Sequence, residues 1–158
     1  MILTASTPIM HEQRIARLIL GFWAAWYAFV VAGNLCDAAR ALGWLGAGWH
    51  FASGNFALVA QTIAIYGLSP AVAAILFAGV IMWELLCIVA FAVATAGLAD
   101  ATRGASTLRP FVVSLPLWMA FILADELFVA FPTGIEGTHL RIFVAHLVSL
   151  IVLRLLAK

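Results

Sequence analysis

The side chains that could do chemistry in this sequence are carboxylates and histidines, with one arginine and one asparagine near them. The candidate site residues are Glu84, Asp125, Glu126, His139, Arg141 and His146, with Asn34 and Asp37 at the rim. Carboxylate and imidazole groups bind transition metals, exchange protons and form ion pairs. These residues therefore define a candidate site for an ion, a ligand or a partner protein.

Helical spacing predicts which of these groups share a face. Residues seven apart in a helix return to within about 20° of the same direction, so His139 and His146 lie on one stripe. Trp118 and Asp125 share a stripe for the same reason, whereas Glu126 is rotated from it by about 100°. The two acids therefore cannot face the same neighbour, and one of them needs a separate partner.

Arg141 is the expected partner of that second acid, because the fork of its guanidinium matches the geometry of a carboxylate. Asn34 and Asp37 lie one helical turn apart on one face. We expect them to meet Arg40 locally, or to reach the end of the segment that carries the two acids.

The composition places these groups in a membrane protein. Hydrophobic residues make up 66% of the 158 residues and charged residues 9%, whereas a soluble domain has about 45–50% and about 25%. So few charges cannot cover the surface of a soluble fold. The net charge of +1 also lacks the basic footprint of a nucleic-acid-binding protein.

Four apolar segments are long enough to cross a hydrocarbon core of about 30 Å, which takes about 20 helical residues. The expected spans are residues 15–33, 70–98, 110–131 and 138–156, in a single transmembrane domain over residues 1–158. Ser69 before Pro70 is an N-cap signal, and Thr138 can cap the fourth span. Pro116 lies inside the third span and is expected to kink it. The fold class is therefore an all-α integral membrane protein with a four-span bundle.

An outer loop over residues 34–69 separates the first two spans. Residues 55–66 have a helical composition, with Ser53 as a possible N-cap and Gly67 as a stop. A helix of this length covers about 18 Å, which is too short to span. We therefore expect an interfacial or re-entrant helix between spans 1 and 2.

The lysines and arginines predict the orientation. Six of the 8 fall on one side and the other two, Arg40 and Arg141, on the opposite side. The first six are Arg14, Arg17, Arg103, Arg109, Arg154 and Lys158. By the positive-inside rule, both termini are expected in the cytoplasm, with the protein in a bacterial cytoplasmic membrane.

The acids gather toward the outer side instead. The outer half holds Asp37, Glu84, Asp125, Glu126 and Glu136. Uncompensated carboxylates are costly in a medium of low dielectric constant. Protonation of some acids, a bound cation, or exposure to interfacial water would each relieve the imbalance.

A transition-metal site is one hypothesis for this cluster. Its candidate ligands are Glu84, Glu126 (or Asp125), His139 and His146. Seven residues separate the two histidines by about 10 Å along a helix, so one of them would bind and the other would lie above or below. Haem b held by two histidines is an alternative, with His50 in the loop as the second ligand. Either hypothesis would make the chain a metal- or haem-dependent redox membrane protein. A quinone site is a separate alternative, because it needs only a histidine or an acid beside aromatic side chains.

Two further hypotheses need no cofactor. A proton-coupled carrier would use Glu84, the lone acid near mid-membrane, as its carrier group. An accessory or binding subunit would use the polar cluster to fix helix packing or to pair with a ligand or partner. Its expected partners are the lipid bilayer and further copies or other membrane subunits. We take this last hypothesis as the leading one.

Sequence motifs add little to this choice. Cys36 and Cys87 do not form a CxxC pair and are expected to be apolar fillers. The sequence contains no P-loop, no GxGxxG and no HExxH pattern, so common nucleotide and zinc-protease chemistry has no support.

Overall fold

The structure is a computed structural model that describes residues 7–46, 48–98, 107–129 and 134–157. These residues form helices and connecting turns, with no strand among them. The helices are α1 (Thr7–Ala41), α2 (Asn55–Ile63), the 3-10 turn η1 (Ala64–Tyr66), α3 (Pro70–Gly97), α4 (Arg109–Leu127) and α5 (Ile135–Leu156).

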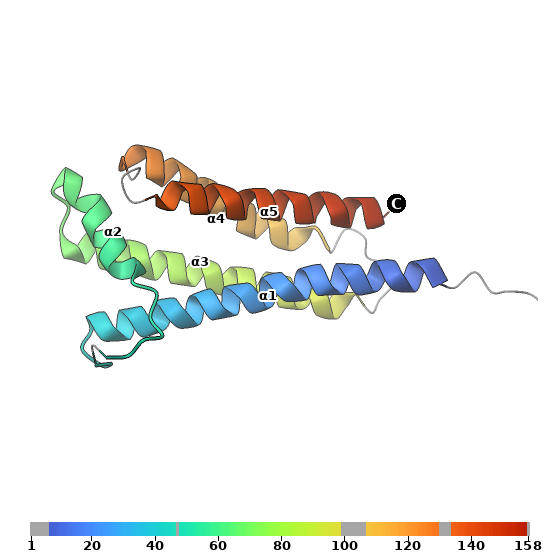
Figure 1. Ribbon diagram of the computed structural model, residues 1–158, viewed down its shortest axis with the longest axis horizontal. Coiled ribbons are helices and arrows are strands. Elements are labelled where there is room, and N and C mark those ends of the chain that lie inside the picture. Colours follow the sequence, from blue (N-terminus) through green and yellow to red (C-terminus); the bar gives the residue numbers. More distant parts are fainter. Residues whose placement is uncertain (1–6, 47, 99–106, 130–133, 158) are drawn as a thin grey trace, which may run out of the picture.

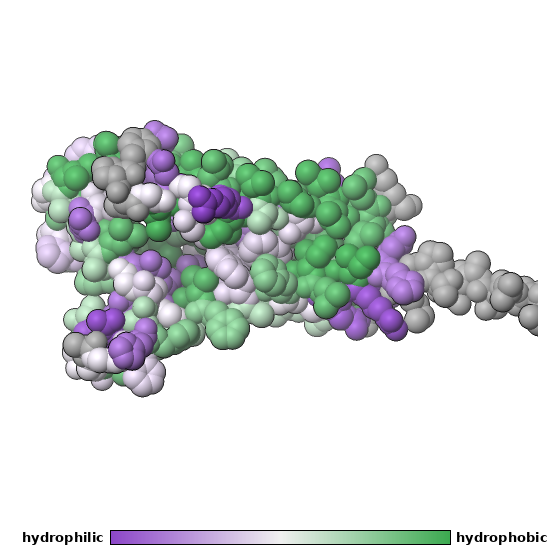
Figure 2. Space-filling view, viewed as in Figure 1, coloured by the Kyte–Doolittle hydropathy of each residue, from purple (hydrophilic) through white to green (hydrophobic). Residues whose placement is uncertain are grey.

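Four of these helices, α1, α3, α4 and α5, are long and apolar enough to cross a membrane. The predicted fold class, a four-span helical bundle with a short helix between spans 1 and 2, is confirmed. The exposed sides of these helices carry large apolar residues, as is required of a bundle that faces lipid. Leu18, Ile75 and Val112, for example, are 72%, 72% and 74% exposed. Figure 2 shows hydrophobic residues along the body of the bundle and hydrophilic ones gathered toward its ends.

The helix limits differ from the predicted ones at several ends. α1 continues to Ala41, beyond the expected end of the span at residue 33, so Asn34 and Asp37 lie one turn apart on the same helix, as their spacing predicted. α5 begins at Ile135, after Gly134 with φ 68°, and Thr138 is therefore an internal residue, not a cap. The expected end of the third span, at residue 131, lies outside the described residues.

The short helix is held at both ends by local structure. Gly54 precedes α2 with φ 76°, and the Ser53 hydroxyl accepts a hydrogen bond from the Asn55 amide at 3.2 Å. Gly67, with φ 67°, follows η1 and donates its backbone N–H to the Ala64 carbonyl. The predicted limits of this helix are therefore correct, with Ser53 acting from one residue before the cap position.

The four long helices form two pairs, and the two helices of each pair lie side by side. α1 lies beside α3, and α4 lies beside α5, while α2 packs on α1 and α3 at one end of the bundle (Figure 1). α1 begins and α5 ends at the opposite end of the bundle. The main buried core contains five aromatic side chains, Trp23, Tyr27, Phe91, Phe111 and Trp118, packed with smaller apolar residues such as Leu20, Leu117 and Leu153.

Pro116 lies inside α4, and the helix continues through it. A proline removes the backbone hydrogen bond to the carbonyl four residues earlier and crowds that turn. In the same turn the Val113 carbonyl accepts a hydrogen bond from the Trp83 indole of α3 at 3.0 Å. α3 and α4 are thus joined at this level.

Candidate functional site

Glu84 lies on α3 and is 3% exposed. Its Oε2 accepts a hydrogen bond of 2.8 Å from the Asn34 amide on α1. The side-chain oxygen of Asn34, Oδ1, in turn accepts a hydrogen bond of 2.8 Å from the side-chain nitrogen of Asn55, Nδ2, at the start of α2. Three helices therefore meet through one chain of side-chain hydrogen bonds. Within the described residues, no hydrogen bond reaches the other carboxylate oxygen of Glu84.

Asp37 holds the start of α2 against α1. Its Oδ2 accepts hydrogen bonds from the Phe56 amide at 2.7 Å and from the Ser53 hydroxyl at 3.3 Å. The first amides of a helix have no partner within the helix, and a carboxylate there also interacts favourably with the helix dipole. The expected contact of Asp37 with Arg40 is absent among the described residues. Asp37 therefore serves the helix end and is not a rim acid awaiting a cation.

Asp125 and His139 are in direct contact between α4 and α5. The distance from His139 Nδ1 to Asp125 Oδ2 is 2.7 Å, and the two side chains are 17% and 7% exposed. The imidazole also stacks on Phe121, with ring centroids 4.9 Å apart and an angle of 18° between the planes. The carboxylate and the aromatic ring together fix the orientation of the imidazole and leave its Nε2 without a partner among the described residues.

Arg141 was expected to pair with one of the two acids of α4, and that expectation was wrong. Arg141 is exposed, and no ion pair joins it to any described residue. It is two residues beyond His139, which turns it by about 200° to the opposite face of α5. Its guanidinium lies against the preceding turn of its own helix, near Gly137. A Cβ added at Gly137 would be 3.7 Å from the Nη2 atom of Arg141. Glu126 is exposed as well, and Asp125 is the acid that faces the bundle.

His146 belongs to a separate buried network. The Tyr27 hydroxyl lies 3.2 Å from His146 Nε2 and accepts a hydrogen bond of 2.8 Å from the Trp118 indole. His146 Nδ1 lies 2.9 Å from the Ile142 carbonyl, and the Trp23 ring lies 3.7 Å from the imidazole, centroid to centroid. Since the carbonyl can only accept, Nδ1 donates to it, and Nε2 accepts from Tyr27. Both ring nitrogens are therefore engaged.

The expected metal ligands do not converge. Within the part of the chain that the structure describes, no group of three or more His, Cys, Asp or Glu side chains could hold a metal ion. Glu84 contacts Asn34, His139 contacts Asp125, and His146 has no free nitrogen. The geometry thus lends no support to a metal site built from these residues, nor to His146 as a haem ligand.

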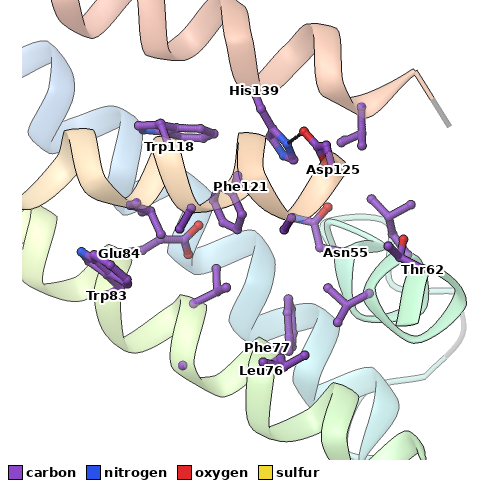
Figure 3. Close-up of a pocket in the computed structure, with 18 of the residues that line it drawn as sticks. Asn55, Thr62, Leu76, Phe77, Trp83, Glu84, Trp118, Phe121, Asp125 and His139 are labelled. Carbon is purple, nitrogen blue, oxygen red and sulfur yellow. Dashed lines mark hydrogen bonds and ion pairs between the residues drawn. The ribbon is translucent and has the colours of Figure 1, made fainter. Parts of the chain in front are cut away.

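A pocket of about 720 Å³ connects Glu84 with the Asp125–His139 pair. Figure 3 shows Glu84 reaching it from α3 and the pair from α4 and α5, with Phe121 between them in this view. Its wall is largely apolar and contains six aromatic side chains: Trp26, Phe77, Trp83, Trp118, Phe121 and Phe128. Its polar groups, apart from the indoles, are Asn55, Thr62, Glu84, Asp125, Thr138 and His139.

The structure therefore divides the predicted cluster. Glu84, Asp125 and His139 line one pocket. Asn34 and Asp37 do not line it; Asn34 contacts Glu84, and Asp37 contacts the start of α2. The remaining three residues, Glu126, Arg141 and His146, do not line the pocket either. Asn55, Thr62 and the aromatic wall were not among the residues predicted from the sequence. A spacing argument could have found Thr62, because it lies seven residues after Asn55 on the same face of the short helix.

Comparison with protein-family models, curated proteins and solved structures gave no match for this chain.

Proposed function

We propose that the protein is a membrane binding subunit that holds a lipid-soluble cation in the pocket between α3 and the α4–α5 pair. The observation that carries the proposal is the charge of the pocket wall. Two carboxylates, Glu84 and Asp125, line the pocket together with one histidine, His139, which contacts Asp125. No lysine or arginine is among the lining residues, so Glu84 is the acid of the wall without a basic partner. A ligand with a positive charge complements this wall.

Glu84 is the group that the proposal assigns to the cation. Asp125 already has His139 as its partner, whereas Glu84 has a single neutral donor, the Asn34 amide. A buried carboxylate without a cationic partner is costly in a medium of low dielectric constant. A bound cation beside the free carboxylate oxygen would remove this cost.

The aromatic wall supports the same class of ligand. The faces of tryptophan, tyrosine and phenylalanine rings attract cations, by about 2 kcal/mol or more where water is excluded. Trp83 and Trp118 lie on either side of Glu84 in Figure 3, and both line the pocket. The volume of about 720 Å³ falls in the range of about 300–1,000 Å³ that is typical of small-molecule sites.

The orientation completes the proposal. The excess of lysine and arginine on the side of the termini supports a cytoplasmic location of both ends and an outer location of the pocket, in a bacterial cytoplasmic membrane. The exposed apolar faces leave room for lipid, for further copies of the chain or for other membrane subunits. Reaction of single introduced cysteines with a membrane-impermeant thiol reagent in intact cells tests this orientation.

Tetraphenylphosphonium is a suitable probe, because it is a lipophilic cation without hydrogen-bond donors. We expect isothermal titration calorimetry of the detergent-purified protein to show one saturable site. Glu84→Gln should weaken binding at least about tenfold, which corresponds to about 1.4 kcal/mol. Glu126→Gln is the matched control, since it makes the same change in an exposed acid outside the pocket.

Neutral triphenylphosphine oxide measures the contribution of charge. We expect it to bind more weakly than the cation, and to bind equally to the wild type and to Glu84→Gln. The proposal is wrong if the wild type does not bind tetraphenylphosphonium, or if the two glutamate variants bind it equally well.

A proton-coupled carrier is the second candidate function, and the environment of Glu84 favours it. A carboxyl group that has one neutral hydrogen-bond partner can hold a proton in the empty pocket and release it when a cation binds. Titration in two buffers with different ionisation enthalpies measures that release. Release of one proton for each bound tetraphenylphosphonium, with no release in Glu84→Gln, would support the carrier function. If the wild type releases no proton, the carrier function is contradicted and the binding function remains.

A further inference from the structure

The pocket has lining residues that are also exposed on the outside of the bundle. Ile75 is 72% exposed, Leu76 43% and Trp83 37%, and Gly79 and Ala120 are exposed as well. All five line the pocket, four from α3 and Ala120 from α4. The pocket therefore opens to the outside between these two helices.

This opening is bounded above and below along the membrane normal. Toward the inside, the Trp83 indole donates to the Val113 carbonyl at 3.0 Å and ties α3 to α4. At the outer end, the Tyr66 hydroxyl donates to the Leu127 carbonyl at 2.6 Å, and its ring packs against Phe128 with centroids 5.6 Å apart. The turn η1 is thus attached to the end of α4, next to the lining residues Ile63 and Phe128.

The opening lies at the depth of lipid chains. At a rise of about 1.5 Å per residue, Ile75 is about 8 Å and Gly79 about 14 Å from the outer end of α3. Ala120 is about 10 Å from the outer end of α4 by the same measure. The residues around the opening are apolar, so its surroundings in a bilayer are acyl chains and not water.

We propose that the ligand is a single-chain cationic amphiphile that enters sideways from the bilayer between α3 and α4. Its ammonium group lies beside Glu84, and its alkyl chain leaves through the opening at Gly79 and Ala120 into the lipid. This inference rests on the proposed function, because it takes the cation at Glu84 as given and adds the chain and the route.

The small side chains at the opening make the proposal testable. A Cβ at Gly79 would meet no heavy atom within 4 Å, so a larger residue there can fill the opening without a clash in the fold. The double variant Gly79→Leu with Ala120→Leu closes the opening from both helices. Gly97→Leu is the matched control, because Gly97 lies at the other end of α3 and is also free of neighbours within 4 Å.

Dodecyltrimethylammonium is the probe for the chain, and tetraphenylphosphonium is the probe without a chain. With protein in lipid nanodiscs, we expect the double variant to bind dodecyltrimethylammonium at least tenfold more weakly than the wild type. It should also bind tetraphenylphosphonium more slowly in stopped-flow tryptophan fluorescence. Gly97→Leu should match the wild type with both probes, and thermal unfolding of each variant verifies the fold.

Different outcomes separate the two proposals. If the wild type binds tetraphenylphosphonium but the double variant binds both probes as the wild type does, the lateral opening is wrong and the proposed function stands. If Val30→Trp and Ile142→Trp abolish binding while the double variant does not, the ligand enters between α1 and α5, which also overturns the inference. If the wild type binds neither probe, the proposed function itself fails.

Discussion

Asn34 on α1 and Glu84 on α3 are joined by a hydrogen bond of 2.8 Å although they lie 50 residues apart in the sequence. Both side chains are almost fully buried, at 1% and 3% exposure. The amide of Asn34 is oriented by this contact, and its carbonyl oxygen is thereby turned toward Asn55 on α2. One asparagine therefore connects the acid of the pocket to the short helix that lines it.

Asn34→Leu should destabilise the protein and loosen α2. The change leaves Glu84 without its donor and Asn55 without its acceptor, and interhelical hydrogen bonds in membrane proteins contribute about 0.6 kcal/mol on average and about 1.7 kcal/mol at most. We expect a loss of about 1–2 kcal/mol in the free energy of unfolding, measured by SDS titration with circular dichroism. Leu35→Ala, at a 51% exposed position on the same turn, should change it far less.

Glu84→Gln provides the complementary measurement. Its amide oxygen can still accept from Asn34, so we expect an unfolding free energy close to that of the wild type. A large loss of stability in Glu84→Gln would show that the charge of the carboxylate, and not its hydrogen bond, holds α1 against α3.

The spans were predictable from the sequence because each depends on local properties. A run of about 20 apolar residues is enough to predict a membrane helix, and Pro70 and Gly67 mark helix ends by their own backbone preferences. Spacing also predicted that Asp125 and Glu126 face about 100° apart. It did not predict which of them faces inward, and the structure assigns that position to Asp125, which is buried, as is Trp118 on the same stripe.

The partners of the polar residues were not predictable in the same way. Helical spacing gives the face on which a residue lies, but not which helix packs against that face. Asp37 was expected to meet Arg40 or the end of the span that carries the two acids. It accepts a hydrogen bond from the Phe56 amide instead, because the loop returns α2 to α1. Arg141 was expected to pair with an acid because the fork of its guanidinium matches a carboxylate, whereas the helical rotation gives that position to His139.

Asp37→Ala should loosen the start of α2 while leaving the four spans in place. The Phe56 amide loses its acceptor and the helix dipole loses a negative charge, and loss of an N-terminal cap costs about 0.5–2 kcal/mol. We expect faster hydrogen exchange over residues 55–63, measured by mass spectrometry in detergent, and unchanged exchange in α4. Arg40→Ala is the control, and acceleration of similar size in that variant would contradict the role given to Asp37.

Asp125 and His139 should show a coupling that Arg141 lacks. In a double-mutant cycle of Asp125→Ala and His139→Ala, we expect an interaction free energy of about 0.5–1 kcal/mol, reduced from a fully buried pair because the imidazole is partly exposed. The cycle of Asp125→Ala with Arg141→Ala should give a value near zero. SDS unfolding of the variants in the two cycles measures both interaction free energies. A larger value for Asp125 with Arg141 than for Asp125 with His139 would show that Arg141 is the partner of Asp125.

Tyr27→Phe should destabilise the core more than its small change in volume suggests. The hydroxyl accepts from the Trp118 indole and donates to His146 Nε2, so its removal leaves two buried polar groups without a partner. At about 0.6 kcal/mol on average for each hydrogen bond in a membrane, with an added cost for the unsatisfied groups, we expect a loss of about 1–2 kcal/mol.

Ser114→Ala is the matched control for Tyr27→Phe, because it also removes one buried hydroxyl from the bundle. The Ser114 hydroxyl has no hydrogen-bond partner among the described residues, so its removal abolishes a polar group that was buried without compensation. Such a change is neutral or stabilising, and the unfolding free energy of Ser114→Ala should equal or exceed that of the wild type. If both variants lost the same stability in SDS titration, the size of the side chain, and not the hydrogen-bond network of Tyr27, would account for the effect.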